Sequence, residues 1–231
     1  MRAYILCGGF GTRLSAVLQG SQKAVVDIHG RPFLALVLAQ LKQAGISDAV
    51  LCAHYRADQL AELLPTLSAE SGLALALVVE EQPMGTGGAV LQALREMPPG
   101  GRYLVLNADT WLDHSAYHLA MNATEDVLVG VKVEDRSRYG SLSCSNSLQL
   151  LALNEKGVGG PGLVNAGVYG FTVDSLDGFA LQACSMEQDI LPQLIARQSL
   201  KVGEYSGPFI DIGTPDSLSA FKSGFQEVAS A

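Results

Sequence analysis

The sequence contains no hydrophobic run long enough to cross a membrane. A membrane-spanning helix needs about 20 mostly apolar residues in succession, and every apolar run in this chain ends earlier. The chain also starts directly in an apolar segment, residues 1–6, without the pattern of a secretory signal peptide. We therefore expect a cytoplasmic protein that has no membrane partner.

Cysteine is scarce, and the histidines show neither a metal-ligand pattern nor that of a catalytic triad. The four cysteines are Cys7, Cys52, Cys144 and Cys184. They lack the paired spacing of a metal site, so we interpret them as reduced thiols rather than as disulfides or zinc ligands. His114 and His118 are four residues apart on an expected helix but lack the flanking glutamate of a zinc protease motif.

Positive charge is also in deficit. The chain has 15 Lys and Arg against 23 Asp and Glu, which gives a net charge of −8 and a pI near 4.9. This balance argues against nucleic acid and anionic membrane surfaces as partners. The net charge does not exclude anionic small molecules as substrates, because binding them needs only local cations and a divalent metal. With 48% hydrophobic residues and a mean hydropathy of +0.23, the 231 residues are sufficient for a sizeable core.

Short apolar strands alternate with helices through the first half of the chain. We expect strands at 1–6, 48–53, 73–80 and 102–106, and helices at 32–45, 57–67 and 88–96. The second helix should end or break near Pro65. This order predicts an α/β fold with a Rossmann-like, doubly wound mixed sheet, whose ligands lie at the carboxyl ends of the strands.

The second half has a different pattern. Strands are expected at 126–133, 141–144, 148–153 and 163–172, followed by a helix at 186–197, a strand at 200–203 and a helix at 215–228. Gly and Ser turns between several of the strands indicate an antiparallel addition to the sheet. No linker separates the halves, so we expect a single domain over 1–231, with halves of about 1–125 and 126–231.

A glycine-rich loop follows the first expected strand. Gly8, Gly9 and Gly11 allow backbone N–H groups to approach a phosphate closely. Arg13 adds a permanent cation whose planar donors suit phosphate oxygens, and Lys23 adds a second cation ten residues later. The glycine order is not that of a dinucleotide fold, and no P-loop motif is present, which disfavours a dehydrogenase and a P-loop NTPase.

Two aspartates are candidates for a metal site. Asp109 follows the fourth expected strand, and Asp211 stands alone in an apolar run, where an unpaired carboxylate would be costly. Mg²⁺ commonly binds one or two carboxylates together with substrate phosphates and water. The alternatives are that Asp109 caps the helix near Asp113 and that Asp211 is held in a hydrogen-bonded turn.

Polar residues at other strand ends could recognise a base and a sugar. Glu80 begins a second glycine-rich loop, residues 80–88, and its carboxylate could accept both the ring N–H and the amino group of guanine. Uracil and thymine offer only one such donor. In the second half, acid and amide groups at Glu155 and Asn165 could bind sugar hydroxyls, and Lys156 could hold a phosphate. A solvated strand end is the alternative for each of these residues.

The loop at residues 8–14 (GGFGTRL), followed by Lys23, resembles the signature of sugar-1-phosphate nucleotidyltransferases. Further matches are Gly30-Arg31-Pro32, Glu80 to Gly88, Asn107 to Thr110, Arg138-Tyr139-Gly140, Glu155-Lys156, Asn165 to Tyr169 and Asp211 to Pro215. The motifs are most similar to those of short bacterial guanylyltransferases for D-glycero-α-D-manno-heptose 1-phosphate, and next to those of mannose-1-phosphate guanylyltransferases. The resemblance implies the nucleotide-diphospho-sugar transferase type of fold.

The resemblance also implies a reaction in which GTP and a sugar 1-phosphate give a GDP-sugar and pyrophosphate with Mg²⁺. The implied catalytic residues are Arg13, Lys23 and Asp109, and the implied metal ligands are Asp109 and Asp211. The implied nucleotide-binding residues are Leu6, Gly8, Gly9, Gly11, Thr12, Arg13, Lys23, Glu80, Gly85, Thr86 and Asp109. Gly140, Glu155, Lys156 and Asn165 are implied to bind the sugar phosphate.

The chain departs from the family pattern at residues 22–24, where Gln-Lys-Ala replaces Pro-Lys-Pro. Because proline stiffens a loop, we expect Lys23 to be more mobile and turnover slower. We also expect no C-terminal β-helix of the kind that some relatives carry. An enzyme for UTP, dTTP or CTP and a non-catalytic sugar-nucleotide sensor remain alternatives, although Arg13, Lys23, Asp109 and Asp211 are all present. Composition is compatible with a monomer or a homodimer.

Overall fold

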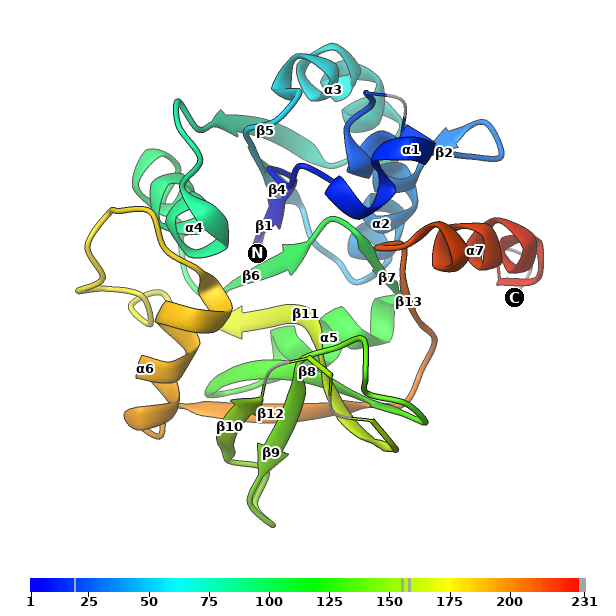
Figure 1. The fold of residues 1–231 in the computed structure, drawn as a ribbon. Helices are drawn as coiled ribbons and strands as arrows, with labels where there is room; N and C mark the ends of the chain where they lie inside the picture. Colours follow the sequence, from blue (N-terminus) through cyan, green and yellow to red (C-terminus); the bar gives the residue numbers. More distant parts are fainter. Residues whose placement is uncertain (19, 155, 158, 229–231) are drawn as a thin grey trace.

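The centre of the fold is a nine-stranded mixed sheet. The computed structural model describes residues 1–18, 20–154, 156–157 and 159–228. In the first half, β1 (Arg2–Leu6), β4 (Asp48–Ala53), β5 (Ala74–Val79) and β6 (Tyr103–Asn107) run parallel in the spatial order β6-β1-β4-β5. The doubly wound arrangement expected from the sequence is confirmed (Figure 1).

Helices cover both faces of the sheet (Figure 1). One face carries α2 (Phe33–Gln43), α3 (Ala57–Ser71), α5 (His114–Asn122) and α7 (Pro215–Val228), and the other carries α4 (Gly85–Glu96) and α6 (Leu191–Ala196). Successive side chains of β1 therefore enter different cores. Ala3 and Ile5 pack on one face, and Tyr4 on the opposite face.

The expectation that the second helix ends or breaks near Pro65 is wrong. The helix α3 continues to Ser71 and stops at Gly72, whose positive φ of 65° closes it. Proline removes one intrahelical hydrogen bond, but Pro65 lies on the exposed side of α3, where water can satisfy the freed carbonyl. Leu60 and Leu67 are buried on the opposite side and hold the helix on the sheet.

The second half extends the sheet as expected. β11 (Gly162–Phe171) is antiparallel to β6 and joins the two halves. It also pairs antiparallel with β8 (Asp126–Val133) and β9 (Ser141–Cys144), and β10 (Leu150–Asn154) pairs with β9. The last strand of the sheet, β12 (Leu200–Tyr205), is two residues longer than expected and runs parallel to β8.

Two short strand pairs and three short helical turns were not expected from the sequence. β7 (Thr110–Leu112) pairs antiparallel with β13 (Phe209–Asp211), and β2 (Asp27–Ile28) pairs with β3 (Arg31–Pro32). The helical turns are η1 (Thr12–Leu14), α1 (Ser15–Leu18) and η2 (Lys23–Val25). The helix expected at 186–197 is present as the π-helical η3 (Met186–Ile190) followed by α6. The β7–β13 pair is central to the site, because it sets Asp211 opposite Thr110.

The strand order changes direction between β1 and β6. The chain moves from β1 outward to β4 and β5, and then returns across the sheet to β6 on the other side of β1. Loops at the carboxyl ends of such neighbouring strands diverge and leave a crevice for ligands. In the part of the chain that is described, no helix has the length and apolar character needed to span a bilayer.

Candidate functional site

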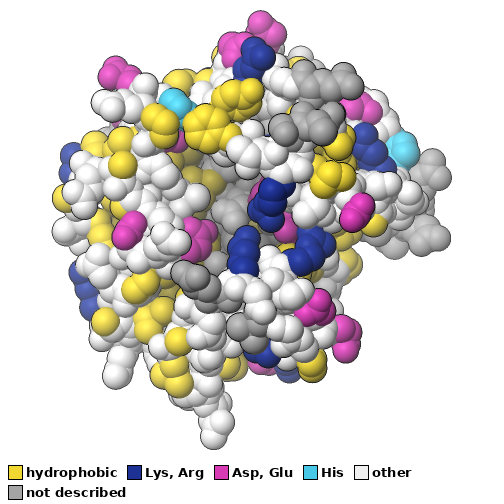
Figure 2. Space-filling view, in the orientation of Figure 1, with side chains coloured by type: hydrophobic (Ala, Val, Ile, Leu, Met, Phe, Trp, Pro, Cys, Tyr) yellow, Lys and Arg dark blue, Asp and Glu magenta, His cyan; other side chains and the backbone are white. Residues whose placement is uncertain are grey.

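Two cavities meet at the carboxyl ends of β1 and β6. The first has a volume of about 300 Å³ and lies between the glycine loop, the loop of Lys23 and the start of α4. The second, about 900 Å³, lies between Arg13, β7 and the strands of the second half. Asn107 and Asp109 line both cavities. Figure 2 shows a hollow in this face of the molecule, with basic side chains around it.

Most of the residues expected from the sequence line one of these cavities. The first is lined by Leu6, Gly8, Gly9, Lys23, Glu80, Gly85, Thr86 and Asp109. The second is lined by Arg13, Asp109, Gly140, Lys156, Asn165 and Asp211. Gly11 and Thr12 line neither cavity; Gly11 has a φ of 60° and shapes the turn before η1. Glu155 lies outside the described residues.

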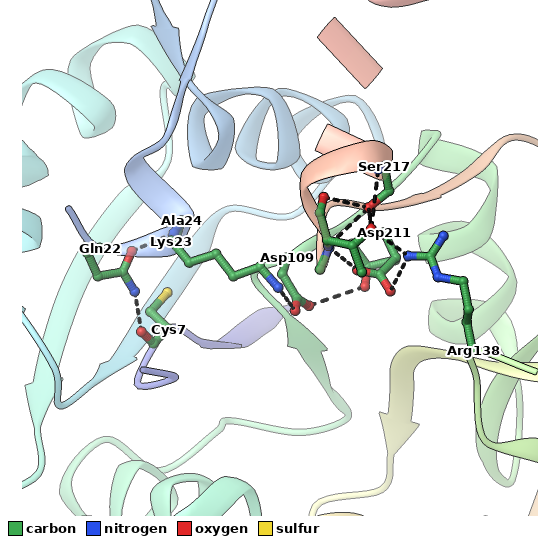
Figure 3. Close-up of polar contacts among 11 residues, drawn as sticks. Cys7, Gln22, Lys23, Ala24, Asp109, Arg138, Asp211 and Ser217 are labelled. Atoms are coloured by element: carbon green, nitrogen blue, oxygen red, sulfur yellow. Dashed lines mark hydrogen bonds and ion pairs between the residues drawn. The ribbon is translucent and has the colours of Figure 1, made fainter. Parts of the chain in front are cut away.

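Lys23 reaches the junction of the cavities. It is the first residue of η2, and its Nζ lies 2.5 Å from Oδ2 of Asp109. The Lys23 side chain is 13% exposed and that of Asp109 35% exposed, so the pair is partly shielded from water. Figure 3 shows the extended lysine approaching Asp109 from the side of the glycine loop. A partly buried ammonium group at this point can neutralise a phosphate that spans the junction.

Asp211 lies next to Asp109 because of the β7–β13 pair. The amide N–H of Ile212 donates to the backbone oxygen of Asp109 at 3.0 Å, which joins the two segments. Asp211 Oδ1 accepts the N–H of Gly213, and its Oδ2 lies 3.9 Å from Nη2 of Arg138. In Figure 3, Arg138 approaches Asp211 from the side opposite Lys23.

The alternative roles of the two aspartates have different outcomes. Asp109 does not cap the following helix, because Asp113 does so by accepting the N–H of Ser115 at 2.8 Å. The hydrogen-bonded turn considered for Asp211 is present, through Gly213. A Cβ at Gly213 would lie 2.6 Å from Asp211 Oδ1, so a glycine at that position lets the carboxylate adopt this conformation.

The two carboxylates fit a Mg²⁺ site completed by substrate. Among the described residues, no group of three or more His, Cys, Asp or Glu side chains could hold a metal ion. Mg²⁺ does not need such a group, since it keeps several waters and takes phosphate oxygens as ligands. Asp109, which lines both cavities, and Asp211, which lines the second, supply hard oxygen donors, which matches that preference.

Glu80 is buried against the glycine loop at the end of β5. Its residue surface is 6% exposed, and Oε2 accepts the N–H of Met84 at 2.7 Å. Burial raises the pKa of the Glu80 carboxyl, and the Met84 N–H and the nearby His54 partly oppose this effect. A Cβ at Gly8 would lie 3.0 Å from Oε1 of Glu80, so the glycine makes room for the carboxylate.

The glycines at the start of α4 have a role that the sequence did not reveal. We expected residues 82–88 to form a loop, but α4 already begins at Gly85. A Cβ at Gly85 or Gly88 would lie 2.6 Å from the backbone oxygen of Cys184 or Gln182, respectively. The N–H of Gly87 also donates to the Cys184 oxygen at 2.9 Å. These glycines therefore let residues 182–185 pack closely on the helix.

The same contact brings Glu187 to the second cavity. Thr86 Oγ1 donates to Glu187 Oε2 at 3.0 Å and accepts the N–H of Met186 at 2.8 Å. Glu187 lines the second cavity beside Asn165, whose amide donates to Tyr169 at 2.9 Å. No sequence pattern pointed to Glu187, because its place depends on a contact with Thr86, about 100 residues away in the chain. Asn107, Asn154 and Gln188 also line this cavity. Asn107 belongs to one of the matched motifs, and no role was expected for Gln188.

A comparison with known protein families identifies the family of the chain. The model of the family described as "Nucleotidyl transferase" matches residues 2–227. The chain belongs to this nucleotidyl transferase family. The match confirms the resemblance to this family that the motifs indicated.

Two curated relatives show how much of the chain is shared. The D-glycero-alpha-D-manno-heptose 1-phosphate guanylyltransferase of Campylobacter jejuni is 30% identical, over 96% of this nucleotidyl transferase and 98% of the relative. The mannose-1-phosphate guanyltransferase of Yarrowia lipolytica is 31% identical over 93% of this chain. This chain spans only 61% of the length of that second relative.

Solved structures agree with the family assignment. HddC from Yersinia pseudotuberculosis superposes with a TM-score of 0.83 at 29% identity, covering 97% of this chain and 99% of HddC. A second HddC structure, complexed with GMP-PN, gives the same TM-score at 30% identity. The inositol-1-phosphate CTP transferase of T. maritima shares the fold, with a TM-score of 0.82 at 15% identity.

Proposed function

We propose that this nucleotidyl transferase is a sugar-1-phosphate guanylyltransferase. Its substrates would be GTP and D-glycero-α-D-manno-heptose 1-phosphate, and its products GDP-D-glycero-α-D-manno-heptose and pyrophosphate. The observation that supports this most is the meeting of two cavities at Asp109, with Lys23 at the junction. A nucleotide in the first cavity and a sugar phosphate in the second would bring their phosphates together there.

The choice of GTP rests on Glu80. In this proposal the Glu80 carboxylate, which lines the first cavity, accepts the N1–H and the amino group of guanine there. Each carboxylate oxygen has two lone pairs, so Oε2 can hold the Met84 N–H and still accept from a base. The GMP-PN complex of HddC, a structure 30% identical to this chain, is consistent with a guanine nucleotide.

The transfer needs no protein nucleophile. An oxygen of the sugar phosphate would attack the α-phosphorus of GTP in line, and the bond to the β-phosphate oxygen would break to release pyrophosphate. Lys23 would neutralise charge on the transferring phosphate, and Arg13 would stabilise the departing pyrophosphate. Mg²⁺ held by Asp109 and Asp211 would supply further positive charge to the phosphate oxygens. Catalysis is then positioning and charge neutralisation.

The sugar end is proposed to be read in the second cavity. Gly140, Lys156 and Asn165 line it, as does Glu187, whose carboxylate is an acceptor for sugar hydroxyls. We favour the heptose phosphate because the Campylobacter relative matches almost end to end. Mannose 1-phosphate is the second candidate, since a mannose-1-phosphate relative has a similar identity of 31%.

Pyrophosphate release from purified protein tests the proposal. GTP, ATP, UTP, dTTP and CTP would each be paired with the 1-phosphates of D-glycero-α-D-manno-heptose, mannose and glucose, with Mg²⁺ present. We expect release with GTP and the heptose phosphate. Release only with GTP and mannose 1-phosphate would make mannose 1-phosphate the sugar substrate in place of the heptose phosphate. A preference for UTP or dTTP would contradict the role of Glu80. A folded protein that binds nucleotide but releases nothing would favour the sensor alternative.

A further inference from the structure

The side chain of Gln22 bridges the glycine loop and the loop of Lys23. It is 1% exposed, one of the few fully buried polar side chains among the described residues. Its Nε2 donates to the backbone oxygen of Cys7, at the end of β1, and its Oε1 accepts the N–H of Ala24 at 2.5 Å. Figure 3 shows the amide lying between these two backbone groups. Gln22 thereby connects Ala24, on the other side of Lys23, to the end of β1.

A second glutamine fixes the backbone of Gln22 itself. The N–H of Gln22 donates to Oε1 of Gln59, on α3, at 2.7 Å. Cys7, which accepts the hydrogen bond from the Gln22 side chain, donates its own N–H to the backbone oxygen of Cys52 at 2.8 Å. The loop around Lys23 is therefore connected to β4 and α3 through hydrogen bonds that are buried or partly buried. Such bonds are worth more, and are costlier to break, where water cannot replace them.

These hydrogen bonds stand where relatives with Pro-Lys-Pro have prolines. A proline at position 22 or 24 would carry no N–H, whereas Gln22 and Ala24 each have one that needs a partner. Gln59 satisfies the first and the Gln22 side chain satisfies the second. The expected mobility of Lys23 therefore does not follow from the loss of the prolines, because hydrogen bonds restrain the loop instead.

We infer that Gln22 is a positioning residue for the transfer reaction. By holding η2 against the glycine loop, it sets the Lys23 ammonium group beside Asp109, where the two cavities meet. A displacement of a catalytic cation by about 1 Å can reduce turnover by about 100-fold. The inference rests on the proposed transfer reaction, but not on which base or sugar the enzyme uses.

The first test replaces Gln22 with methionine (Gln22→Met). Methionine has a similar length but neither donates to Cys7 nor accepts from Ala24. We expect kcat to fall by about 10- to 100-fold, while KM for the nucleotide changes by less than about threefold, because the glycines and Glu80 remain. An unchanged kcat, or an effect confined to KM, would overturn the inference.

The second test uses pH in the conservative variant Gln22→Glu. A protonated glutamic acid reproduces both the donor to Cys7 and the acceptor for Ala24, whereas the ionised form cannot donate. Because burial raises the pKa of such a carboxyl group, the ratio of variant to wild-type kcat should be near one at low pH and fall as pH rises. A ratio that does not vary between about pH 5.5 and 9 would contradict the inference, even if Gln22→Met failed to fold.

Gln149→Met is the matched control. Gln149 is half-buried and donates from its side chain to the oxygen of Leu200 at 2.7 Å, on the edge formed by β10 and β12. It lines neither cavity. We expect this variant to lower the melting temperature of the protein while leaving kcat unchanged. Equal losses of kcat in both methionine variants would mean that Gln22 acts only through general stability.

A readout that needs no substrate separates this inference from the proposed function. The ¹³Cε resonance of Lys23, assigned by its loss in Lys23→Arg, reports whether the ammonium group stays in its ion pair. We expect Gln22→Met, and not Gln149→Met, to move that resonance toward those of the exposed lysines. No movement would overturn the inference, whereas movement in a protein inactive with every substrate pair would overturn only the transfer reaction.

Discussion

At the scale of single residues, Glu80 is a buried carboxylate packed against Gly8 of the glycine loop. Its carboxylate is held by the N–H of Met84 and lies over Gly8, where any larger residue would crowd it. Neutralising it should therefore affect ligand binding rather than the fold. Its neighbour Glu81 is exposed, which provides a matched control.

We predict that Glu80→Gln lowers kcat/KM for GTP by about 100-fold and that for UTP by much less. The amide offers guanine one acceptor in place of two and sets its own N–H₂ against a donor of the base, a mismatch that buried sites reject strongly. Steady-state kinetics with both nucleotides would measure this, with Glu81→Gln expected to match the wild type. Equal losses for GTP and UTP would show that Glu80 does not read the base.

The same residue predicts a pH dependence. Because burial raises the pKa of Glu80, the carboxylate that accepts from guanine should be lost on acidification at a higher pH than an ordinary glutamate would require. The wild-type Kd for GTP should therefore rise as pH falls below neutrality. The Kd of Glu80→Gln should stay flat over that range, and a parallel rise in both proteins would assign the effect to another group.

The sequence was informative about residues that belong to local motifs. Gly8, Gly9 and Glu80 each follow a strand closely, so the edge of the sheet fixes their place, and Lys23 belongs to the same motif as the glycine loop. Side chains whose role depends on distant contacts could not be found in this way. Gln22, for example, looked like a simple departure from a proline, and only its buried contacts give it a role.

At the scale of elements, the packing of residues 182–190 on α4 shapes the second cavity. The helix begins with Gly85, and the adjoining segment passes so close that Gly87 has no room for a side chain. A Cβ there would lie 2.8 Å from Cys184 Sγ and from Ile190 Cδ1. The contact carries Glu187, on η3, to the wall of the cavity.

We predict that Gly87→Ala lowers the free energy of unfolding by about 1–3 kcal/mol through overpacking. In a solvent-exposed helix the same substitution would stabilise the protein by up to about 1 kcal/mol. The sign of the change in unfolding free energy is therefore enough to report the close contact. KM for the sugar phosphate should rise more than KM for GTP. Denaturant unfolding would measure the stability, with Gly100→Ala as control, since a Cβ at Gly100 meets nothing within 4 Å. A stabilised Gly87→Ala would contradict the packing described.

Element prediction failed where tertiary contacts overrode local preference. The strands β7 and β13 have three residues each, too few for a periodic pattern, and they exist because they pair with each other. The helix α3 continued through Pro65 because its apolar side is buried in the core. Longer segments with clear apolar patterns, such as β4 and α2, were found close to their observed limits.

At the scale of the whole molecule, one continuous sheet joins residues from both halves of the chain. Its central pairing of β6 with β11 places Asp109 and Asn165 at the same cavity, although they are far apart in the sequence. Asp109 and Asp211 could each be recognised as candidates, but only the β7–β13 pair makes them neighbours. An acidic protein with a net charge of −8 thus gathers Arg13, Lys23 and Lys156 where phosphates would lie.

The most direct test follows the phosphate of the sugar through the reaction. Purified protein would receive GTP, Mg²⁺ and D-glycero-α-D-manno-heptose 1-phosphate labelled with ¹⁸O in its non-bridging phosphate oxygens, and the products would be resolved by mass spectrometry. The account predicts a GDP-sugar that carries all of the label, unlabelled pyrophosphate, and a loss of rate of about 1,000-fold in Asp109→Asn. Label in the pyrophosphate, or wild-type turnover by Asp109→Asn, would contradict it.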